Sequence, residues 1–427
     1  MLFPAPTPPA EAPRVVITGA GIVTALGAGW QPNADGFRSG RTAFRPVTRF
    51  DVSRQRVKVA AEADVPAIER RLLAGFAVNG GERYLGRLNE RQFARLDVSG
   101  KLLLCAALEC WQQSGWEPSA ALPLVLGTTA GGMSLGEAYF RQATLTPEDH
   151  RGQATRAIHY QPQAQGRALI EALRCEGSIT ILSNACAAGS NSLGHAWEMI
   201  RSGSAERVLA AGYEGLSQLL FAGFDSLQAI SPTLCRPFDA HRDGLSVGEG
   251  AAALALETLE SARRRGAVIL AEFLGYGCGI DLHHLTQPQP EGDAALASMN
   301  AACQAARITP ADVDYINAHG TGTPLNDSAE ALAIGRWGGA RTSTLPVSST
   351  KAGIGHLLGG AGAVEAVACL MALREGFLPP ELAFETPDPA CTFPVVREPR
   401  EAKLRVALSN SFGFGGVNAT IILRRWE

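Results

Sequence analysis

The sequence lacks several features that would point to particular classes of protein. No uninterrupted apolar run reaches the roughly 18 residues of a membrane-spanning helix, which argues against an integral membrane protein. Lysine and arginine form no basic block and the net charge is only −3, so nothing supports a nucleic-acid partner. The nine cysteines are odd in number and form no CxxC pair, which argues against a disulfide framework and a structural zinc site. Such cysteine usage is typical of a reducing compartment, and we expect a cytoplasmic protein.

The first residues also lack a targeting signal. Residues 1–13 have neither the basic start nor the apolar core of a signal peptide, and their prolines predict a flexible tail. Of the 427 residues, 46% are hydrophobic and 19% are charged. The remaining chain is therefore long and apolar enough for two domains or one large duplicated unit with a substantial core.

Short β-branched runs alternate with helical patterns over most of the chain, which predicts an α/β fold with buried sheets. Strands are predicted at residues 14–21, 122–127, 178–182, 207–214 and 251–256. Residues 97–111 carry apolar side chains at helical spacing. The stretch from Tyr139 to Gln165 is polar, and it fits either an irregular lid or a surface for a partner.

The first predicted strand ends in glycines that are typical of a dinucleotide-binding turn. That fingerprint needs a third glycine three residues after Gly21, and the position holds Thr24. We therefore expect neither a Rossmann cofactor site here nor a bound cofactor elsewhere. His283 and His284 have no carboxylate at a recognisable ligand spacing, so no metal site is expected.

A cysteine lies where the strand at 178–182 turns into a helix. Cys186 stands among small residues, with Ala185 before it and Ala187, Ala188 and Gly189 after it. Free backbone N–H groups and the positive end of a helix dipole favour a thiolate at such a position. A buried structural cysteine fits the same stretch, because free cysteines are often buried. The position alone leaves both interpretations open.

The same arrangement recurs in the second half of the chain. A strand at 345–348 leads into a turn of small residues that contains Lys351, and an Ala- and Gly-rich helix is predicted from His356 to Leu373. This repetition indicates duplication of one α/β unit, with halves at 14–257 and 258–427.

Two further stretches carry side chains that suit a site. His319 ends a predicted strand and is followed by Gly320-Thr321-Gly322-Thr323, where hydroxyls and glycines suit a polar ligand, although a structural histidine is the alternative. Phe412 and Phe414 lie in a glycine-rich turn. That turn is either a hydrophobic plug or a movable aromatic gate.

Together these residues resemble the elongating β-ketoacyl-acyl-carrier-protein synthases, decarboxylative condensing enzymes of the thiolase superfamily. The motifs that carry the resemblance occur in the family's order and are Asn184-Ala185-Cys186-Ala187-Ala188-Gly189, His319-Gly320-Thr321-Gly322-Thr323-Pro324, Ser349-Thr350-Lys351 with Gly355-His356, and Phe412-Gly413-Phe414-Gly415-Gly416. The resemblance spans the chain from about Arg14 to the C-terminus. It implies a thiolase-like fold, in which two duplicated α/β halves form a layered αβαβα architecture.

The resemblance also implies a role for each catalytic residue. Cys186 would take an acyl group from a carrier-protein thioester and hold it as an acyl-enzyme. His319 and His356 would donate neutral Nε2–H groups to the enolate that malonyl-carrier protein forms when it loses CO₂. Lys351 would orient His356, and Glu365 matches a family carboxylate near the active site.

Other implied roles concern the substrate's arm and its entry. The backbone N–H groups of Cys186 and Phe414 would form a second oxyanion hole, and Phe414, with Phe412 in the same turn, would act as the gate. Thr321 and Thr323 would hydrogen-bond the phosphopantetheine arm.

Ala130 departs from the usual family pattern, because many elongating members carry a larger aliphatic residue there. We expect the small side chain to open a deeper or wider pocket that admits long or rigid, polyene-like chains.

The implied partners are an acyl carrier protein, which brings its substrates on phosphopantetheine, and a second ketosynthase-like chain. Family members dimerise through the sheets of their N-terminal halves, so we expect a homodimer or a heterodimer with a chain-length-factor subunit. The pathway is either fatty-acid synthesis or a polyene or polyketide route. Two alternatives are disfavoured. A noncatalytic subunit would lack Cys186, and a cysteine-dependent hydrolase would not need two histidines and Lys351.

Overall fold

The computed structural model describes residues 12–79, 82–119 and 121–427. The predicted flexible tail at 1–13 therefore lies almost entirely outside the described residues. No helix in the described ranges is long and apolar enough to cross a lipid bilayer.

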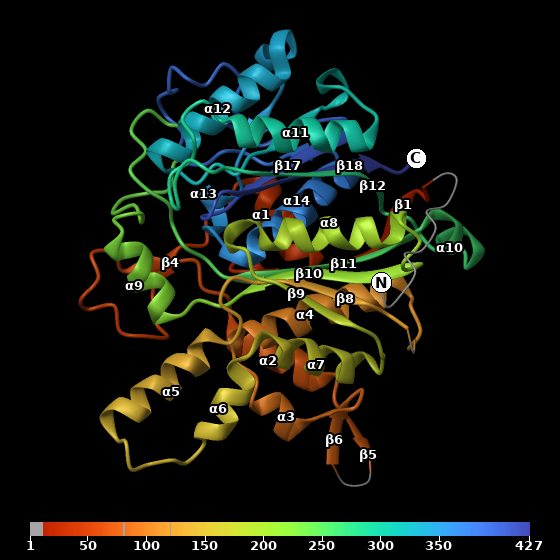
Figure 1. Cartoon of the computed structure of the whole chain (residues 1–427), viewed down its shortest axis with the longest axis vertical. Coiled ribbons are helices and arrows are strands. Elements are labelled where there is room, and N and C mark those ends of the chain that lie inside the picture. Colours follow the sequence, from red (N-terminus) through yellow and green to blue (C-terminus); the bar gives the residue numbers. More distant parts are fainter. Residues whose placement is uncertain (1–11, 80–81, 120) are drawn as a thin grey trace.

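Two sets of five strands form the framework of the molecule (Figure 1). The N-terminal set runs in the order β1 (Val15–Thr24), β11 (Gly250–Thr258), β10 (Arg207–Glu214), β8 (Leu124–Gly127) and β9 (Ile179–Leu182). The C-terminal set runs in the order β12 (Ala271–Ile280), β18 (Val417–Arg425), β17 (Val406–Phe412), β13 (Tyr315–Asn317) and β14 (Val347–Ser348).

Both sets have the same pairing pattern. In each, the first three strands pair antiparallel and the last two join in parallel. The chain thus consists of two duplicated α/β halves, as the repeated strand and turn predicted. Residues Val15–Ile17 of β1 also pair with Ala271–Phe273 of β12, which joins the two sets into one sheet. Because the sheet continues across this junction, the division of the chain at residues 257–258 stays a prediction.

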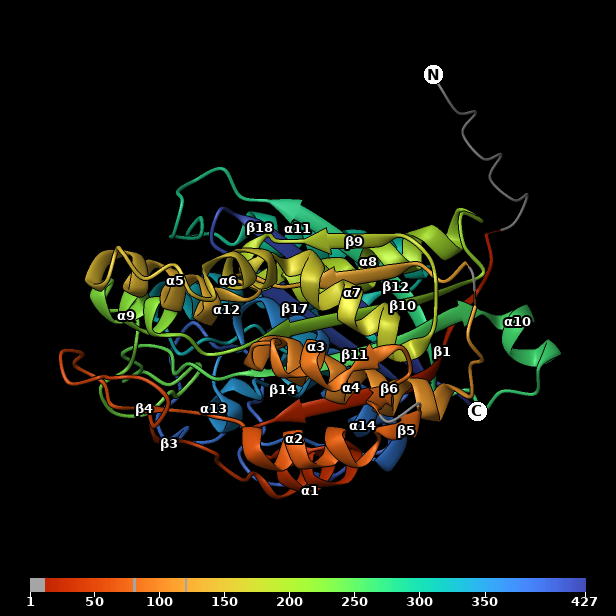
Figure 2. The ribbon, with the colours of Figure 1, turned by 90° about the horizontal axis from the view of Figure 1, so that it is seen from below.

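Helices lie between the two sets and on both outer faces, which gives the layered αβαβα architecture (Figures 1 and 2). The middle layer holds α8 (Ala188–Arg201) and α14 (Ala361–Glu375). The outer helices are α4 (Val98–Ser114) and α7 (Pro162–Leu173) on the N-terminal set, and α11 (Asp293–Ala306) and α12 (Pro324–Gly338) on the C-terminal set. The remaining helices of eight or more residues are α1 (Trp30–Ser39), α2 (Val65–Ala74), α5 (Met133–Leu145), α6 (Gln153–Tyr160) and α9 (Gln218–Ser226).

The two middle helices approach each other so closely that no side chain fits between their N-terminal ends. A Cβ atom on Gly189 of α8 would lie 2.8 Å from the backbone N of Ala363 in α14 and 2.8 Å from the backbone O of Gly359. The first thirteen residues of α14 are all buried, which explains why this helix consists mainly of alanine and other apolar residues. This packing brings the turns that precede the two helices together.

The glycines near the N-terminus also serve packing. The expected turn at Gly19-Ala20-Gly21 is wrong, because β1 continues through these residues to Thr24. A Cβ atom on Gly21 would lie 1.9 Å from the backbone O of Ala106 in α4. The glycines therefore let a strand and a helix touch, and they form no nucleotide-binding loop.

Two further elements differ from the sequence-based expectation. Residues 139–165, which carried no clear pattern, lie largely in α5, α6 and the start of α7, and neither α5 nor α6 has a buried residue. The predicted helix from His356 begins only at Ala361, because Gly355 and Leu358 have φ values of 75° and 48°, which no α-helix tolerates.

We expect Gly189→Ala to destabilise the protein, because the added methyl group would push the middle helices apart. An overpacked core position costs roughly 1–3 kcal/mol of unfolding free energy. Gly223→Ala in α9 is the matched control, since a Cβ atom there would meet no other atom within 4 Å and alanine favours helix. Chemical denaturation of both variants checks this, and equal stability of the two would contradict the packing argument.

Candidate active site

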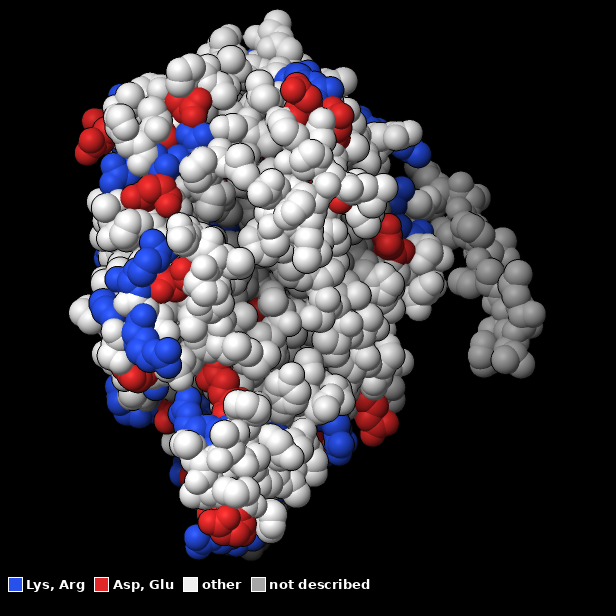
Figure 3. Space-filling model, turned by 60° about the vertical axis from the view of Figure 1, so that its left-hand side comes forward, with Lys and Arg blue, Asp and Glu red and all other residues white. Residues whose placement is uncertain are grey.

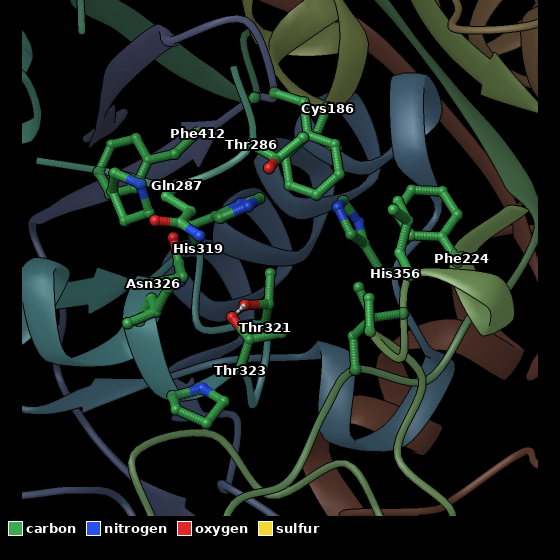
Figure 4. A pocket seen from close by; sticks show the side chains of 18 of the residues that line it. Cys186, Phe224, Thr286, Gln287, His319, Thr321, Thr323, Asn326, His356 and Phe412 are labelled. Atoms are coloured by element: carbon green, nitrogen blue, oxygen red, sulfur yellow. Dashed lines mark hydrogen bonds between the residues drawn. The ribbon is translucent and has the colours of Figure 1, made fainter. Parts of the chain in front are cut away.

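A cavity of about 410 Å³ collects side chains from segments that are far apart in the sequence. Its lining includes Cys186, His319, His356, Thr321, Thr323, Phe412 and Phe414. Figure 4 shows the two histidines facing the space below Cys186, with the two threonines further along the cavity. The structure thus brings together residues from all four motifs.

Cys186 lies in a sharp turn between β9 and α8. The 3₁₀ turn Ala185–Ala187 connects the two elements, and Ala185 has a φ of 55°, in the left-handed region that alanine rarely adopts. Such local strain at a nucleophile is held in place by the packing around it. The turn presents the cysteine at the N-terminal end of α8, as the sequence predicted.

The helix N-terminus, which favours a thiolate, does not ionise Cys186 in the resting protein. Burial raises the pKa of the thiol to about 12, and the positive charge of Lys351 and the N–H of Phe414 oppose this only in part. Loss of water around the sulfur outweighs the helix N-terminus. Cys186 is therefore a neutral thiol until a substrate or a base removes its proton.

His319 follows β13, and two carboxylates of α12 fix the backbone around it. Glu330 accepts the N–H groups of His319 and Gly320 at 2.9 and 2.8 Å. Asp327 accepts the N–H of Thr321 at 3.0 Å and that of Gly322 at 3.1 Å. The sequence-based prediction missed both carboxylates, although their i, i+3 spacing on a helix after the His319 loop puts them on one face.

Hydrogen bonds to its backbone and to its ring hold His356 in place. Its N–H donates to the carbonyl of Ser246 at 2.6 Å, and its carbonyl accepts the N–H of Gly248 at 3.0 Å. The ring Nδ1 accepts the N–H of Leu358 at 3.3 Å. A neutral imidazole that accepts at Nδ1 carries its proton on Nε2, so His356 has an Nε2–H to donate.

Both histidines are neutral. Burial lowers the pKa of each ring well below the ordinary 6.5, and the positive charge of Lys351 lowers both further. The two rings lie 5.3 Å apart between centroids, at an interplanar angle of 83°. Two uncharged imidazoles can therefore point at one small group in the cavity.

Lys351 and Glu365 form a buried ion pair beneath the site. Burial raises the pKa of Glu365, and the charge of Lys351 opposes this rise. No hydrogen bond joins Lys351 to His356 among the described residues, so Lys351 acts on that ring through its charge. The ring's orientation comes instead from the contacts of its backbone and of Nδ1. Neither Lys351 nor Glu365 lines the cavity.

The glycine-rich turn between β17 and β18 holds two aromatic rings in different settings. Phe412 packs against His319, with 5.5 Å between ring centroids. Phe414 is 38% exposed and lies 5.9 Å from the ring of Phe224 in α9. Gly415 has a φ of 83° and donates its N–H to the carbonyl of Leu285 at 2.7 Å. Phe412 is fixed, whereas Phe414 lies next to glycines that permit rotation.

The candidates for substrate contact fall on two sides of Cys186. The hydroxyl groups of Thr321 and Thr323 hydrogen-bond each other at 2.9 Å in the cavity (Figure 4). Ala130 does not line this cavity. It lies in the turn after β8, where its N–H donates to Glu214 at 3.1 Å. Its contact with an acyl chain stays a prediction.

The sequence-based prediction also missed part of the cavity wall. Phe224 and Leu227 contribute from α9 and the residue after it. His284, for which the sequence predicted no metal site, lines the cavity with Leu285 and Thr286. These segments have no motif of their own, so only the fold reveals them. No three His, Cys, Asp or Glu side chains are placed to hold a metal ion in the described ranges.

Comparison with protein families and individual proteins gives consistent matches. The model of the beta-ketoacyl synthase N-terminal domain matches residues 12–262, and that of the C-terminal domain matches residues 270–385. A curated relative, 3-oxoacyl-[acyl-carrier-protein] synthase 2 of Synechocystis, is 36% identical over 98% of this chain and 99% of its own length.

Solved structures match over nearly the whole chain as well. The ishigamide ketosynthase/chain length factor has a TM-score of 0.87 and 30% identity, over 98% of this chain and 100% of that chain. A type II polyketide ketosynthase (AntDE) solved in complex with its acyl-carrier protein (AntF) has a TM-score of 0.85 and 26% identity, over 97% and 100% of the two chains.

We expect His319 and His356 to stay neutral in weakly acidic solution. An ordinary histidine gains its proton near pH 6.5, whereas a ring whose pKa is lowered gains it only at lower pH. NMR of protein with ¹⁵N-labelled histidine, recorded from about pH 7.5 down to about pH 5.5, should show that the rings of His319 and His356 keep neutral shifts. His319→Asn and His356→Asn assign the signals. Protonation of either ring at about pH 6.5 would contradict the burial argument.

Proposed function

The chain belongs to the β-ketoacyl synthase family, and on this premise we propose that it is a 3-oxoacyl-acyl-carrier-protein synthase. It transfers an acyl group to Cys186 and joins that group to malonyl-carrier protein in a decarboxylative Claisen condensation. The observation that carries the proposal is the cavity in which a buried thiol and two neutral imidazoles meet.

The first half-reaction is transfer of the acyl group. The sulfur of Cys186 attacks the thioester carbonyl of an acyl-carrier protein, and the C–S bond to the carrier's arm breaks. Because the thiol is neutral at rest, its proton has to leave as the new bond forms, and a neutral imidazole can accept it. The proton ends on the departing arm, which leaves as a free thiol. The N–H groups of Cys186 and Phe414 stabilise the tetrahedral oxyanion.

The second half-reaction uses the histidines as donors. Malonyl-carrier protein loses CO₂, and its thioester carbonyl becomes an enolate oxygen. The Nε2–H groups of His319 and His356 stabilise that oxygen; the hydrogen bond at Nδ1 of His356 supports this tautomer. Neutral donors suit this task, because they stabilise an enolate without protonating it.

Condensation closes the cycle with balanced atoms and charges. The enolate carbon attacks the acyl group on Cys186, a C–C bond forms, and the C–S bond to the enzyme breaks. The released thiolate takes up one proton, so each turn consumes one proton and produces one CO₂ and one β-ketoacyl-carrier protein. All the required groups belong to this chain or to the carried thioesters, and we propose that no further cofactor takes part.

We propose that acyl carrier protein binds on the face of the molecule that contains the cavity. Figure 3 shows a hollowed face with Lys and Arg side chains along one margin, interspersed with Asp and Glu. The Lys and Arg side chains offer contacts for an acidic carrier. We propose that Thr321 and Thr323 hydrogen-bond its phosphopantetheine arm. Phe414 would gate the passage between the acylation and malonyl-bound states.

A second ketosynthase-like chain is the other proposed partner. β9 ends the sheet, and no described strand covers its outer edge. Helices α5 and α6 of the same half expose Phe140, Leu145 and Ile158 by 70%, 72% and 63%. An unpaired strand edge and exposed apolar side chains each favour association with a like chain. We propose a dimer in the cytoplasm.

The alternative proposal is that this chain is the catalytic subunit of a heterodimer with a chain-length factor, in a polyene or polyketide pathway. The similarity to the ishigamide ketosynthase/chain length factor favours it. The small side chain of Ala130, beside the nucleophile's turn, is consistent with long or rigid acyl chains as substrates. An assay with acyl primers of increasing length tests this. Activity confined to short primers would contradict it.

We expect Cys186→Ala to abolish condensation, because it removes the atom that holds the acyl group. Wild-type protein, treated with EDTA and given acyl- and malonyl-carrier protein, should release CO₂, form a β-ketoacyl product and gain one acyl mass on Cys186. The variant should gain no acyl mass yet retain some decarboxylation, since both histidines remain.

His319→Ala is the matched control for that assay, because it keeps the acyl mass and loses CO₂ release. Normal condensation by Cys186→Ala would refute the assigned nucleophile. Activity of the purified chain alone supports a homodimer, whereas a strict requirement for a co-expressed homologue lacking the cysteine supports the heterodimer.

A further inference from the structure

A buried carboxylate lies at the end of β10, close to the nucleophile's turn. Glu214 is 0% exposed. Its side chain accepts four hydrogen bonds, all from neutral donors, and no Lys, Arg or His donates to it among the described residues. A buried carboxylate without a cationic partner is costly, and four donors aimed at it indicate a specific task.

The two oxygens of Glu214 connect two turns from different halves of the chain. Oε2 accepts the N–H of Thr129 at 2.7 Å and that of Gly359 at 3.2 Å. Oε1 accepts the N–H of Ala130 at 3.1 Å and the hydroxyl of Thr128 at 3.3 Å. One turn follows β8, and the other lies three residues beyond His356.

These two turns touch backbone to backbone. A Cβ atom on Gly359 would lie 2.2 Å from the N of Thr129 and 2.5 Å from the carbonyl carbon of Thr128. Two N–H donors that point at one place repel each other unless an acceptor lies between them. Glu214 supplies that acceptor, and its negative charge strengthens both bonds.

The turn at residues 128–131 is hydrogen-bonded to the segment that leads from β9 to the nucleophile. Ser183, three residues before Cys186, donates its hydroxyl to the carbonyl of Thr129 at 3.1 Å. No residue from 128 to 131 lines the cavity through which the carrier's arm would enter. Under the proposed function, this turn forms part of the wall that the acyl chain on Cys186 contacts.

We propose that Glu214 is a positioning residue for acyl-chain selection, which holds the wall at Thr129–Ala130 at a fixed distance from the turn behind His356. The inference rests on the proposed function. Glu214 touches neither substrate nor reacting atoms. It acts through the backbone of the turn whose Ala130 is the expected contact for the acyl chain.

Glu330 provides a matched comparison within the same molecule. It is also a buried carboxylate that accepts two backbone N–H groups, those of His319 and Gly320. It has no hydrogen bond to the turn at 128–131. Loss of Glu330 should therefore slow the malonyl half-reaction and leave the choice of acyl primer unchanged.

Glu214→Gln tests the proposal, because glutamine has the same shape but only one acceptor oxygen. Its NH₂ group would face two of the four donors. We expect a change in the ratio of kcat/KM for a dodecanoyl-carrier primer to that for a hexanoyl-carrier primer. The ratio should move toward unity by about tenfold, in line with loss of buried hydrogen bonds. Acyl-enzyme formation on Cys186, followed by intact-protein mass spectrometry, gives both rates.

The pH dependence of this kcat/KM ratio distinguishes the proposed role of Glu214 from a purely structural one. Burial raises the pKa of Glu214 to about 7, so the carboxylate gains a proton as pH falls through that value. The nearby titratable groups are Cys186 and Tyr213, and burial raises the pKa of each well above this range. The wild-type ratio should decline from about pH 8 to about pH 6, whereas that of Glu214→Gln should stay flat.

The outcomes separate the inference from the proposed function. Wild-type protein that never acylates Cys186 refutes the function. Wild-type protein that acylates Cys186 with a ratio constant across the pH range refutes the role of Glu214 alone, even where Glu214→Gln does not fold. A ratio for folded Glu214→Gln within about twofold of wild type refutes it too, as does an equal change in Glu330→Gln.

Discussion

The close approach of two helix N-termini is the constraint on which the rest of this structure depends. α8 and α14 meet at Gly189, Gly359 and Ala363 with no side chain between their backbones. Each helix follows a strand of its own half, and each strand-to-helix connection carries part of the site. Because the helices touch, the turn with Cys186 and the turn with His356 have to be neighbours. The two flanking sheets leave these ends no room to separate.

The same packing sets the electrostatics of the site. Burial of these side chains keeps the proton on the thiol of Cys186 and removes the charge from both imidazoles. The carboxylates that shape the surrounding loops are compensated mainly by backbone N–H groups. Lys351 brings a full positive charge that Glu365 neutralises, and Arg242 brings another, 3.9 Å from Asp327. A site with so little free charge suits a reaction in which charge appears first on one oxygen and then on another, because fixed dipoles can meet both.

The sequence predicted the order of strands and turns and the residues that converge in the cavity. It could do so because strand patterns located the turns, and because the four motifs resemble those of a known family; strand position alone left the role of each residue open. It failed where the outcome depends on distant segments. Nothing near Gly21 reveals that Ala106 lies against it, and nothing near Cys186 reveals how completely water is removed. Glu214, Asp327 and Glu330 were missed because their partners are backbone groups, which leave no pattern of side chains.

The identical pairing of strands in the two halves has a consequence for the chemistry of the site. Two identical half-units would present the same side chains at equivalent positions. Such a pair could not hold an electrophile in one half and stabilise a carbanion in the other. Within one chain, the two halves can carry different residues at equivalent positions. In one half, β9 leads to the nucleophile Cys186. In the other half, the equivalent strand β14 leads to Lys351, which forms an ion pair with Glu365. The two halves thus share one topology but contribute different chemical groups to the site.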